Sequence, residues 1–189
     1  PPKTGEKIEV AAAHKGVPCV LGLGGKSANI VFADADYEKA LRGAQNAIFG
    51  SAGQSCVSGS RVLIERSIFD RFVSDLAQTT NKFIVGNPEE DTTQIGPIHN
   101  KKQYDHVCNM IKTGLAEGAT IPQNNAESIP NSSGYYVNPT VLIGNNAMAC
   151  AQEEIFGPVV VAIPFDTEAE AISIANDSQF GLAGAVWCK

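Results

Sequence analysis

FGSAGQSCVSGSR, residues 49–61, joins the end of a predicted helix to the start of a predicted strand. Between those elements lies a short polar loop with several glycines, and this loop carries Cys56. Most lone cysteines are small buried hydrophobic residues, whereas a cysteine on a loop between regular elements is well placed for chemistry. Cys56 is therefore a candidate nucleophile, and its role depends on the residues around it.

On both sides of this stretch, short apolar runs alternate with amphipathic helical patterns, which predict strands and helices respectively. The alternation predicts an α/β fold, a three-layer α/β/α sandwich whose largely parallel sheet is covered on both faces. The expected strands are 29–32, 61–65, 140–143, 159–163 and 183–187, and the expected helices are 4–15, 37–48, 68–76, 100–116 and 168–175.

Capping residues and apolar stripes refine several of these helices. Asp34 and Asp36 offer N-caps to the helix before the cysteine loop, and Ser67 is expected to cap the next helix. Residues 118–134, rich in Asn, Ser, Pro and Gly, predict a loop. The expected inward stripe of the 100–116 helix is Tyr104, Val107, Cys108, Ile111 and Leu115.

Composition excludes several classes of function. A formal net charge of −6 argues against a nucleic-acid surface, because phosphate binding needs clustered Lys and Arg. No apolar run is long enough for a membrane span, and the opening residues do not read as a secretory signal. We therefore expect a cytoplasmic protein that binds neither nucleic acid nor a membrane.

The five cysteines are scattered, without a C-x-x-C pair, and the three histidines show no metal-ligand spacing with them. This pattern fits neither a disulfide framework nor a zinc site, and it suits a reducing compartment. We expect no metal. The segment Gly22–Ser27 also fails both nucleotide-binding templates, because Val20 and Ser27 stand where a P-loop and a Rossmann fingerprint need glycine.

Three segments together resemble the aldehyde dehydrogenase superfamily of NAD(P)-dependent enzymes. Residues 21–27, LGLGGKS, are similar to the family's L-E-L-G-G-K-S box, and residues 53–56, GQSC, resemble its G-Q-x-C nucleophile loop. Residues 153–159, EEIFGPV, match its E-E-I-F-G-P-V box. Lesser matches, in family order, are Gly96-Pro97, Asn138-Pro139-Thr140-Val141, Asn176-Asp177-Ser178 and Phe180-Gly181-Leu182-Ala183.

The resemblance implies that the Cys56 thiolate attacks an aldehyde, that hydride passes to NAD or NADP, and that the resulting thioester is cleaved. It also implies that the Cys56 backbone N–H helps to hold the oxyanion. By the same resemblance, Glu154 binds the nicotinamide ribose, Phe156 packs near the ring, and Leu23 contributes to cofactor binding. Gly24 and Gly25 are expected to allow close backbone approach.

The chain departs from the family at Gly22, which occupies the place of the family's general base, a glutamate. Glycine cannot accept a proton from water, so we expect impaired thioester hydrolysis; losing a general base costs about 10²–10⁴-fold. Three other readings stay open: an acylating dehydrogenase that transfers the acyl group to coenzyme A, a non-catalytic remnant, and a cysteine acyltransferase or esterase without nicotinamide. Glu154 is a possible substitute base.

The resemblance covers the family's catalytic domain only. Residues 1–16 are expected to be a residual helix of the cofactor-binding domain, and residues 17–189 the nucleophile-bearing catalytic domain, truncated at its C-terminus. We therefore expect weak NAD(P) binding and little activity from this chain alone. A small aldehyde is the expected substrate, and self-association through surfaces exposed by the truncation is expected.

Overall fold

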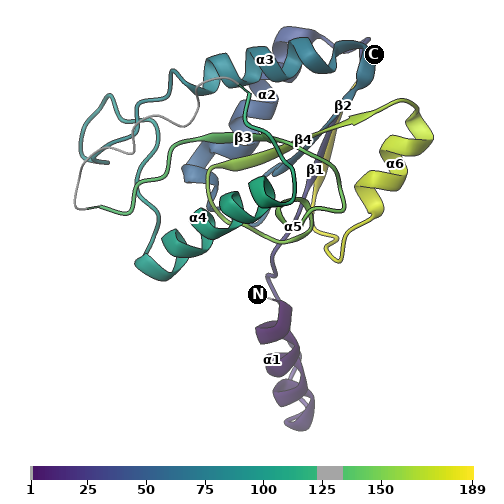
Figure 1. The fold of residues 1–189 in the computed structure, drawn as a ribbon. Helices are drawn as coiled ribbons and strands as arrows, with labels where there is room; N and C mark the ends of the chain where they lie inside the picture. The colour runs from purple at the N-terminus through teal and green to yellow at the C-terminus, as the bar shows by residue number, and fades with distance from the viewer. Residues whose placement is uncertain (1, 123–133) are drawn as a thin grey trace.

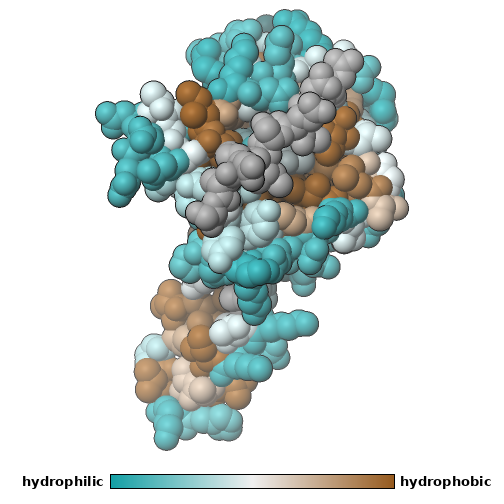
Figure 2. All heavy atoms as spheres, turned by 60° about the vertical axis from the view of Figure 1, so that its left-hand side comes forward, coloured by the Kyte–Doolittle hydropathy of each residue, from teal (hydrophilic) through white to brown (hydrophobic). Residues whose placement is uncertain are grey.

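A computed structural model describes residues 2–122 and 134–189 of the chain. Its first helix, α1 (Pro2–His14), projects away from the rest of the molecule (Figure 1). A segment without regular structure leads from α1 into the first strand. Apolar atoms gather on this projecting part of the surface (Figure 2), where the exposed side chains include Ile8, Val10, Val17 and Val20.

The centre of the molecule is a sheet of five parallel strands in the order β3-β4-β2-β1-β5. The strands are β1 (Ala28–Val31), β2 (Arg61–Glu65), β3 (Thr140–Ile143), β4 (Val159–Phe165) and β5 (Gly184–Trp187). The predictions for β2 and β3 match the observed bounds. The predicted parallel arrangement is confirmed for all four strand pairs.

Helices cover both faces of the sheet (Figure 1). On one face lie α2 (Tyr37–Phe49) and α3 (Phe69–Thr80), and on the other α4 (Lys101–Ala116), α5 (Ala149–Gln152) and α6 (Glu168–Asn176). Strand side chains alternate between two cores: Val62 and Ile64 of β2 pack with α2 and α3, while Leu63 packs with α4 and α5. Burial on both faces explains the continuous apolar strands, and the three-layer prediction is confirmed.

One predicted helix cap matches the structure and one does not. The Asp36 carboxylate accepts a hydrogen bond from Lys39 N at 3.2 Å and begins α2. The prediction that Ser67 caps α3 is wrong, because a 3₁₀ turn (Arg66–Ile68) precedes the helix. The Ser67 hydroxyl instead donates to Glu65 Oε1 at 2.9 Å.

The inward face of α4 matches the prediction at Val107, which is buried, and at Tyr104, Cys108 and Ile111, which pack half-buried against the core, but differs at Leu115. Val107, Met110 and Gly114 are its buried residues, and Leu115, expected inside, is exposed. A Cβ on Gly114 would lie 2.9 Å from the Cys150 sulfur, so α4 and α5 approach closely at that glycine and Leu115 turns outward.

The sheet is covered unevenly. Strand β5 pairs only with β1, and its first three residues are exposed. The Trp187 indole N–H donates to Asn29 Oδ1 at 2.8 Å and holds the end of β5 against the core. Among the helices described, none is long and apolar enough to cross a membrane. Most of the predicted 118–134 loop lies outside the described residues.

Candidate active site

Three segments meet at the amino ends of neighbouring strands. Residues 21–27 precede β1, residues 50–60 precede β2 and residues 153–158 precede β4. Because β4, β2 and β1 are adjacent and parallel, the segments before them lie at the same edge of the sheet. The candidate site is therefore formed by the loops that precede the strands, at the amino edge of the sheet. Ligands of open parallel sheets usually bind at the opposite, carboxyl edge.

The first segment contacts both of the others through adjacent glycines. A Cβ on Gly25 would lie 2.4 Å from the Cys56 carbonyl oxygen, and a Cβ on Gly24 would lie 2.2 Å from Glu154 Oε2. The Gly25 backbone N–H donates to Glu154 Oε1 at 3.1 Å. A larger residue at position 25 would push against the Cys56 backbone, and one at position 24 would displace the Glu154 carboxylate.

A third glycine joins the cysteine loop to the 153–158 segment. Gly53 has a φ of 69°, in the left-handed region, and a Cβ there would lie 2.0 Å from the Gly157 carbonyl oxygen. The space left between the three segments is only ≈ 10 Å³, about enough for one water molecule. Every pair of the three segments is thus in direct contact.

Cys56 lies on the exposed side of this junction. The Ser58 N–H donates to Ser55 O at 3.1 Å, which closes a turn that presents Cys56 and Val57 to solvent. The Gly59 N–H donates to Ala47 O at 3.0 Å and fixes the loop to α2. Cys56 is exposed and carries a free thiol, so a small electrophile can reach it.

Glu154 and Phe156 lie beside the cysteine loop and are both half-buried. Phe156 has a φ of 53°, which is rare for an aromatic residue and marks local backbone strain of the kind found at functional sites. Leu23 lies on the far side of the first segment, where its side chain contacts Gly5 of α1. The structure therefore brings Cys56, Glu154 and Phe156 together, while Leu23 faces the projecting helix.

Gly22 differs from the glycines beside it. It is exposed, and a Cβ built there would meet no atom within 4 Å. Close packing does not explain a glycine at this position, because a Cβ would fit without displacing a neighbour.

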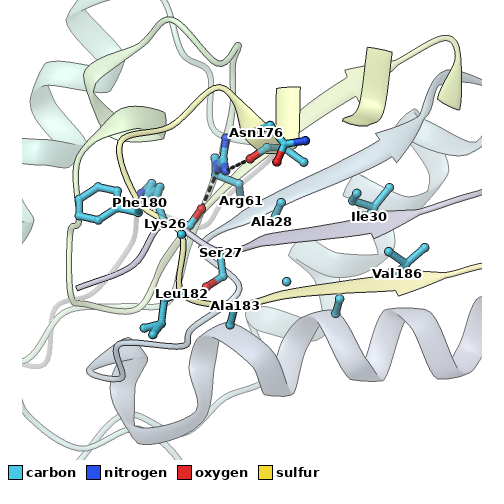
Figure 3. A pocket seen from close by; sticks show the side chains of 14 residues that line it. Lys26, Ser27, Ala28, Ile30, Arg61, Asn176, Phe180, Leu182, Ala183 and Val186 are labelled. Atoms are coloured by element: carbon cyan, nitrogen blue, oxygen red, sulfur yellow. Dashed lines mark hydrogen bonds between the residues drawn. The ribbon is translucent and has the colours of Figure 1, made fainter. Parts of the chain in front are cut away.

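A cavity of ≈ 210 Å³ lies behind the first segment (Figure 3). Its lining includes Lys26, Ser27, Arg61, Ala175, Asn176 and residues 180–186. The Arg61 guanidinium donates to Lys26 O at 3.0 Å and to Ala175 O at 2.8 Å. It also donates to Ile174 O and to Asn146 Oδ1. Arg61 thereby fixes the first segment to the end of α6.

Lys26 is a buried cation that sequence reasoning did not single out. Its Nζ has no hydrogen-bond partner among the described residues. Burial lowers the pKa of Lys26 from 10.5 to about 7. Cys150 opposes this shift, Arg61 adds to it, and Glu154 and Glu153 oppose it more weakly. From the sequence, a lysine in a glycine-rich segment is expected to be exposed, so its burial becomes evident only in the structure.

The motifs and their geometry agree with the comparison to known proteins. A sequence model of the aldehyde dehydrogenase family matches residues 2–189. The chain belongs to the aldehyde dehydrogenase family. It is 41% identical over 186 residues to a betaine aldehyde dehydrogenase of Sinorhizobium fredii, covering 97% of this chain and 38% of that protein.

Solved aldehyde dehydrogenases share the fold. A betaine aldehyde dehydrogenase of Staphylococcus aureus in complex with NAD⁺ superposes with a TM-score of 0.93 at 39% identity, over 99% of this chain and 38% of that one. An aldehyde dehydrogenase of Bacillus cereus in complex with NAD⁺ gives 0.93 at 41% identity, over 98% and 38%. The chain thus spans little more than a third of the length of these family members.

Beside Cys56 the fold places a hydrogen-bond acceptor and an aromatic ring. The acceptor is the Glu154 carboxylate, and the ring is that of Phe156, which offers a partly exposed apolar surface. Among the described residues, no group of three His, Cys, Asp or Glu side chains is arranged to hold a metal ion.

Proposed function

We propose that this chain forms the nucleophile-bearing part of an enzyme that oxidises a small aldehyde with NAD or NADP, through a covalent intermediate on Cys56. The observation that carries the proposal is the mutual contact of the three family segments around an exposed cysteine. Family membership and the NAD⁺ complexes of related enzymes support the same reaction class.

In the first step the Cys56 thiolate attacks the aldehyde carbon and forms a tetrahedral thiohemiacetal. The Cys56 backbone N–H donates to the developing oxyanion. When bound, NAD(P)⁺ accepts the hydride that leaves the tetrahedral carbon. Cys56 then carries a thioester, while Glu154 and Phe156 hold the nicotinamide ribose and ring.

Release of the acyl group is the step for which this chain is poorly equipped. Hydrolysis requires a base that removes a proton from the attacking water, and Gly22 offers none. The general-base effect is worth about 10²–10⁴-fold, so we infer slow hydrolysis and an accumulating thioester on Cys56.

Acyl transfer to coenzyme A is the second candidate, and the open space at Gly22 favours it. A thiol is far more acidic than water, so its attack on the thioester needs less help from a base. The product would be an acyl-coenzyme A, with the Cys56 thiolate as leaving group. Both candidates share every step up to the thioester.

Single-turnover kinetics on the complete gene product would test the proposal. The measurement follows NADH formed from NAD⁺ and a panel of aldehydes that includes betaine aldehyde, with and without coenzyme A. We expect a burst of about one NADH per site that then stalls, and Cys56→Ala should abolish it. Sustained turnover only with coenzyme A would identify an acylating enzyme. Absence of a burst with every aldehyde would contradict the oxidoreductase proposal and leave a non-catalytic member of the family.

A further inference from the structure

The 153–158 segment receives most of its side-chain hydrogen bonds from α4. The Gln103 side-chain amide donates to two successive carbonyls, Ile155 O at 2.7 Å and Phe156 O at 3.1 Å. One turn further along the helix, His106 Nε2 lies 3.1 Å from Glu154 O. These contacts reach only the backbone of the 153–158 segment and do not involve the side chains of Glu154 and Phe156.

Gln103 is itself held in place by the cap of its helix. The Asn100 side chain accepts a hydrogen bond from the Gln103 backbone N–H at 2.9 Å, which fixes the first turn of α4. The Gln103 side chain is half-buried, so the bonds to Ile155 and Phe156 are partly shielded from water.

The segment that leads into α4 also binds the cysteine loop. Gln54 Nε2 donates to Pro97 O at 3.3 Å, and Gln54 Oε1 accepts from His99 N at 2.9 Å. Residues 97–106 therefore contact both the cysteine loop and the 153–158 segment, each through a glutamine amide that makes two bonds.

We propose that Gln103 is a positioning residue for the reaction: it holds the Glu154–Phe156 backbone at a set distance from Cys56. This inference rests on the proposed function. It assigns a role to a residue of α4, a helix that lies outside the three family segments. The strain at Phe156 makes such a brace necessary, because its left-handed backbone is costly and persists only where neighbours fix it. A small displacement of this segment would move both groups that face the cofactor.

The first test needs no cofactor. Hydrogen exchange of the backbone amides of residues 153–157 is compared between this chain and Gln103→Met, which keeps the side chain's length but removes the donor. We expect exchange there to accelerate about 5–30-fold, the loss of two ordinary hydrogen bonds, with the strands unchanged. Lys102→Met, an exposed change on the same turn of α4, is the control and should leave exchange at its original rate.

The second test uses the complete gene product and separates binding from chemistry. Gln103→Met should raise KM for NAD⁺ about tenfold while the iodoacetamide labelling rate of Cys56 stays unchanged, because the cysteine loop keeps its own contacts through Gln54. Gln103→Lys retains a hydrogen-bond donor that can reach the two carbonyls, so its KM for NAD⁺ should lie between those of the wild type and Gln103→Met. Gln103→Glu directs a carboxylate at two carbonyls and should be worse than Met.

The two tests distinguish failure of this inference from failure of the proposed function. A folded Gln103→Met protein with unchanged exchange at residues 153–157 overturns the role of Gln103, whatever the enzyme does. If Gln103→Met shows faster exchange but the wild-type enzyme shows no NADH burst, the positioning role of Gln103 is supported. That outcome overturns only the proposed oxidoreductase function. Uniformly faster exchange throughout the sheet would show a general structural role and would also overturn the inference.

Discussion

Two glycines of the first family segment, Gly22 and Gly25, have opposite surroundings. Gly25 is buried against the Cys56 carbonyl, where a Cβ would come within 2.4 Å, whereas Gly22 is exposed with no atom within 4 Å of its Cβ position. Packing dictates glycine at position 25 and leaves position 22 unconstrained. The residue at 25 thus shapes the site, whereas in the mechanism proposed above the residue at 22 decides whether water can cleave the thioester.

The largest effect is expected from restoring a carboxylate at position 22. Gly22→Glu introduces a general base into open space, so hydrolysis of the Cys56 thioester should accelerate about 10²–10⁴-fold. The measurement is steady-state NADH production by the complete gene product in the absence of coenzyme A. Gly22→Gln, with the same shape and no basicity, is the matched control; equal rates in both variants would contradict the base assignment.

The second-largest effect is expected from a substitution that disrupts the close contact at position 25. Gly25→Ala places a methyl group against the Cys56 carbonyl and displaces the nucleophile, so the NADH burst rate should fall about 100-fold. Gly22→Ala adds the same methyl group where nothing opposes it and should change the burst rate little. Similar losses in the two alanine variants would refute the contrast between the two positions.

A smaller effect is expected at Gly53, which joins the cysteine loop to Gly157. Gly53→Ala meets both a left-handed backbone and a carbonyl oxygen at 2.0 Å, so it should lower the free energy of unfolding by about 1–3 kcal/mol. Urea unfolding of this chain measures the loss. Gly118→Ala, at a left-handed glycine with open space around it, isolates the backbone contribution and should cost less.

The smallest effect, taken per pH unit, concerns Lys26 and the dependence of stability on pH. Between the folded pKa of about 7 and the ordinary value of 10.5, the unfolded chain binds a proton that the folded chain lacks. Stability should therefore rise with pH across this window, by at most about 1.4 kcal/mol per pH unit, and lose this slope below pH 7. Lys26→Met should remove the slope. Urea unfolding of both proteins from pH 6 to 10 provides the difference, and parallel profiles would contradict the burial of the amine.

The sheet was the most predictable part of the structure. Strands β2 and β3 are short apolar runs buried on both faces, so hydrophobic pattern alone locates them. The convergence of the three family segments also follows from topology, since each precedes a strand and the strands are parallel neighbours. These features depend on local pattern and connectivity, which a sequence carries directly.

Contacts to backbone atoms were beyond prediction. The side chains of Gln103 and Gln54 form hydrogen bonds with backbone groups of distant loops, and the positions of those groups depend on loop geometry. Every residue has a backbone carbonyl, so the residue types of the partners do not indicate these bonds. Ser67 failed as a cap because a 3₁₀ turn over residues 66–68 precedes α3, so the helix begins after it. Leu115 failed as a core residue because the close contact between α4 and α5 falls on its neighbour Gly114. Both outcomes depend on three-dimensional surroundings that the local pattern does not carry.

The most direct test of the central claim is intact-protein mass spectrometry of the complete gene product after mixing with an aldehyde and NAD⁺. If Cys56 forms a thioester that Gly22 cannot help to hydrolyse, an acyl adduct should accumulate to about one per chain, map to Cys56, and disappear rapidly only in Gly22→Glu. Continuous NADH formation without a persistent adduct on Cys56, or an adduct on another residue, would contradict the account.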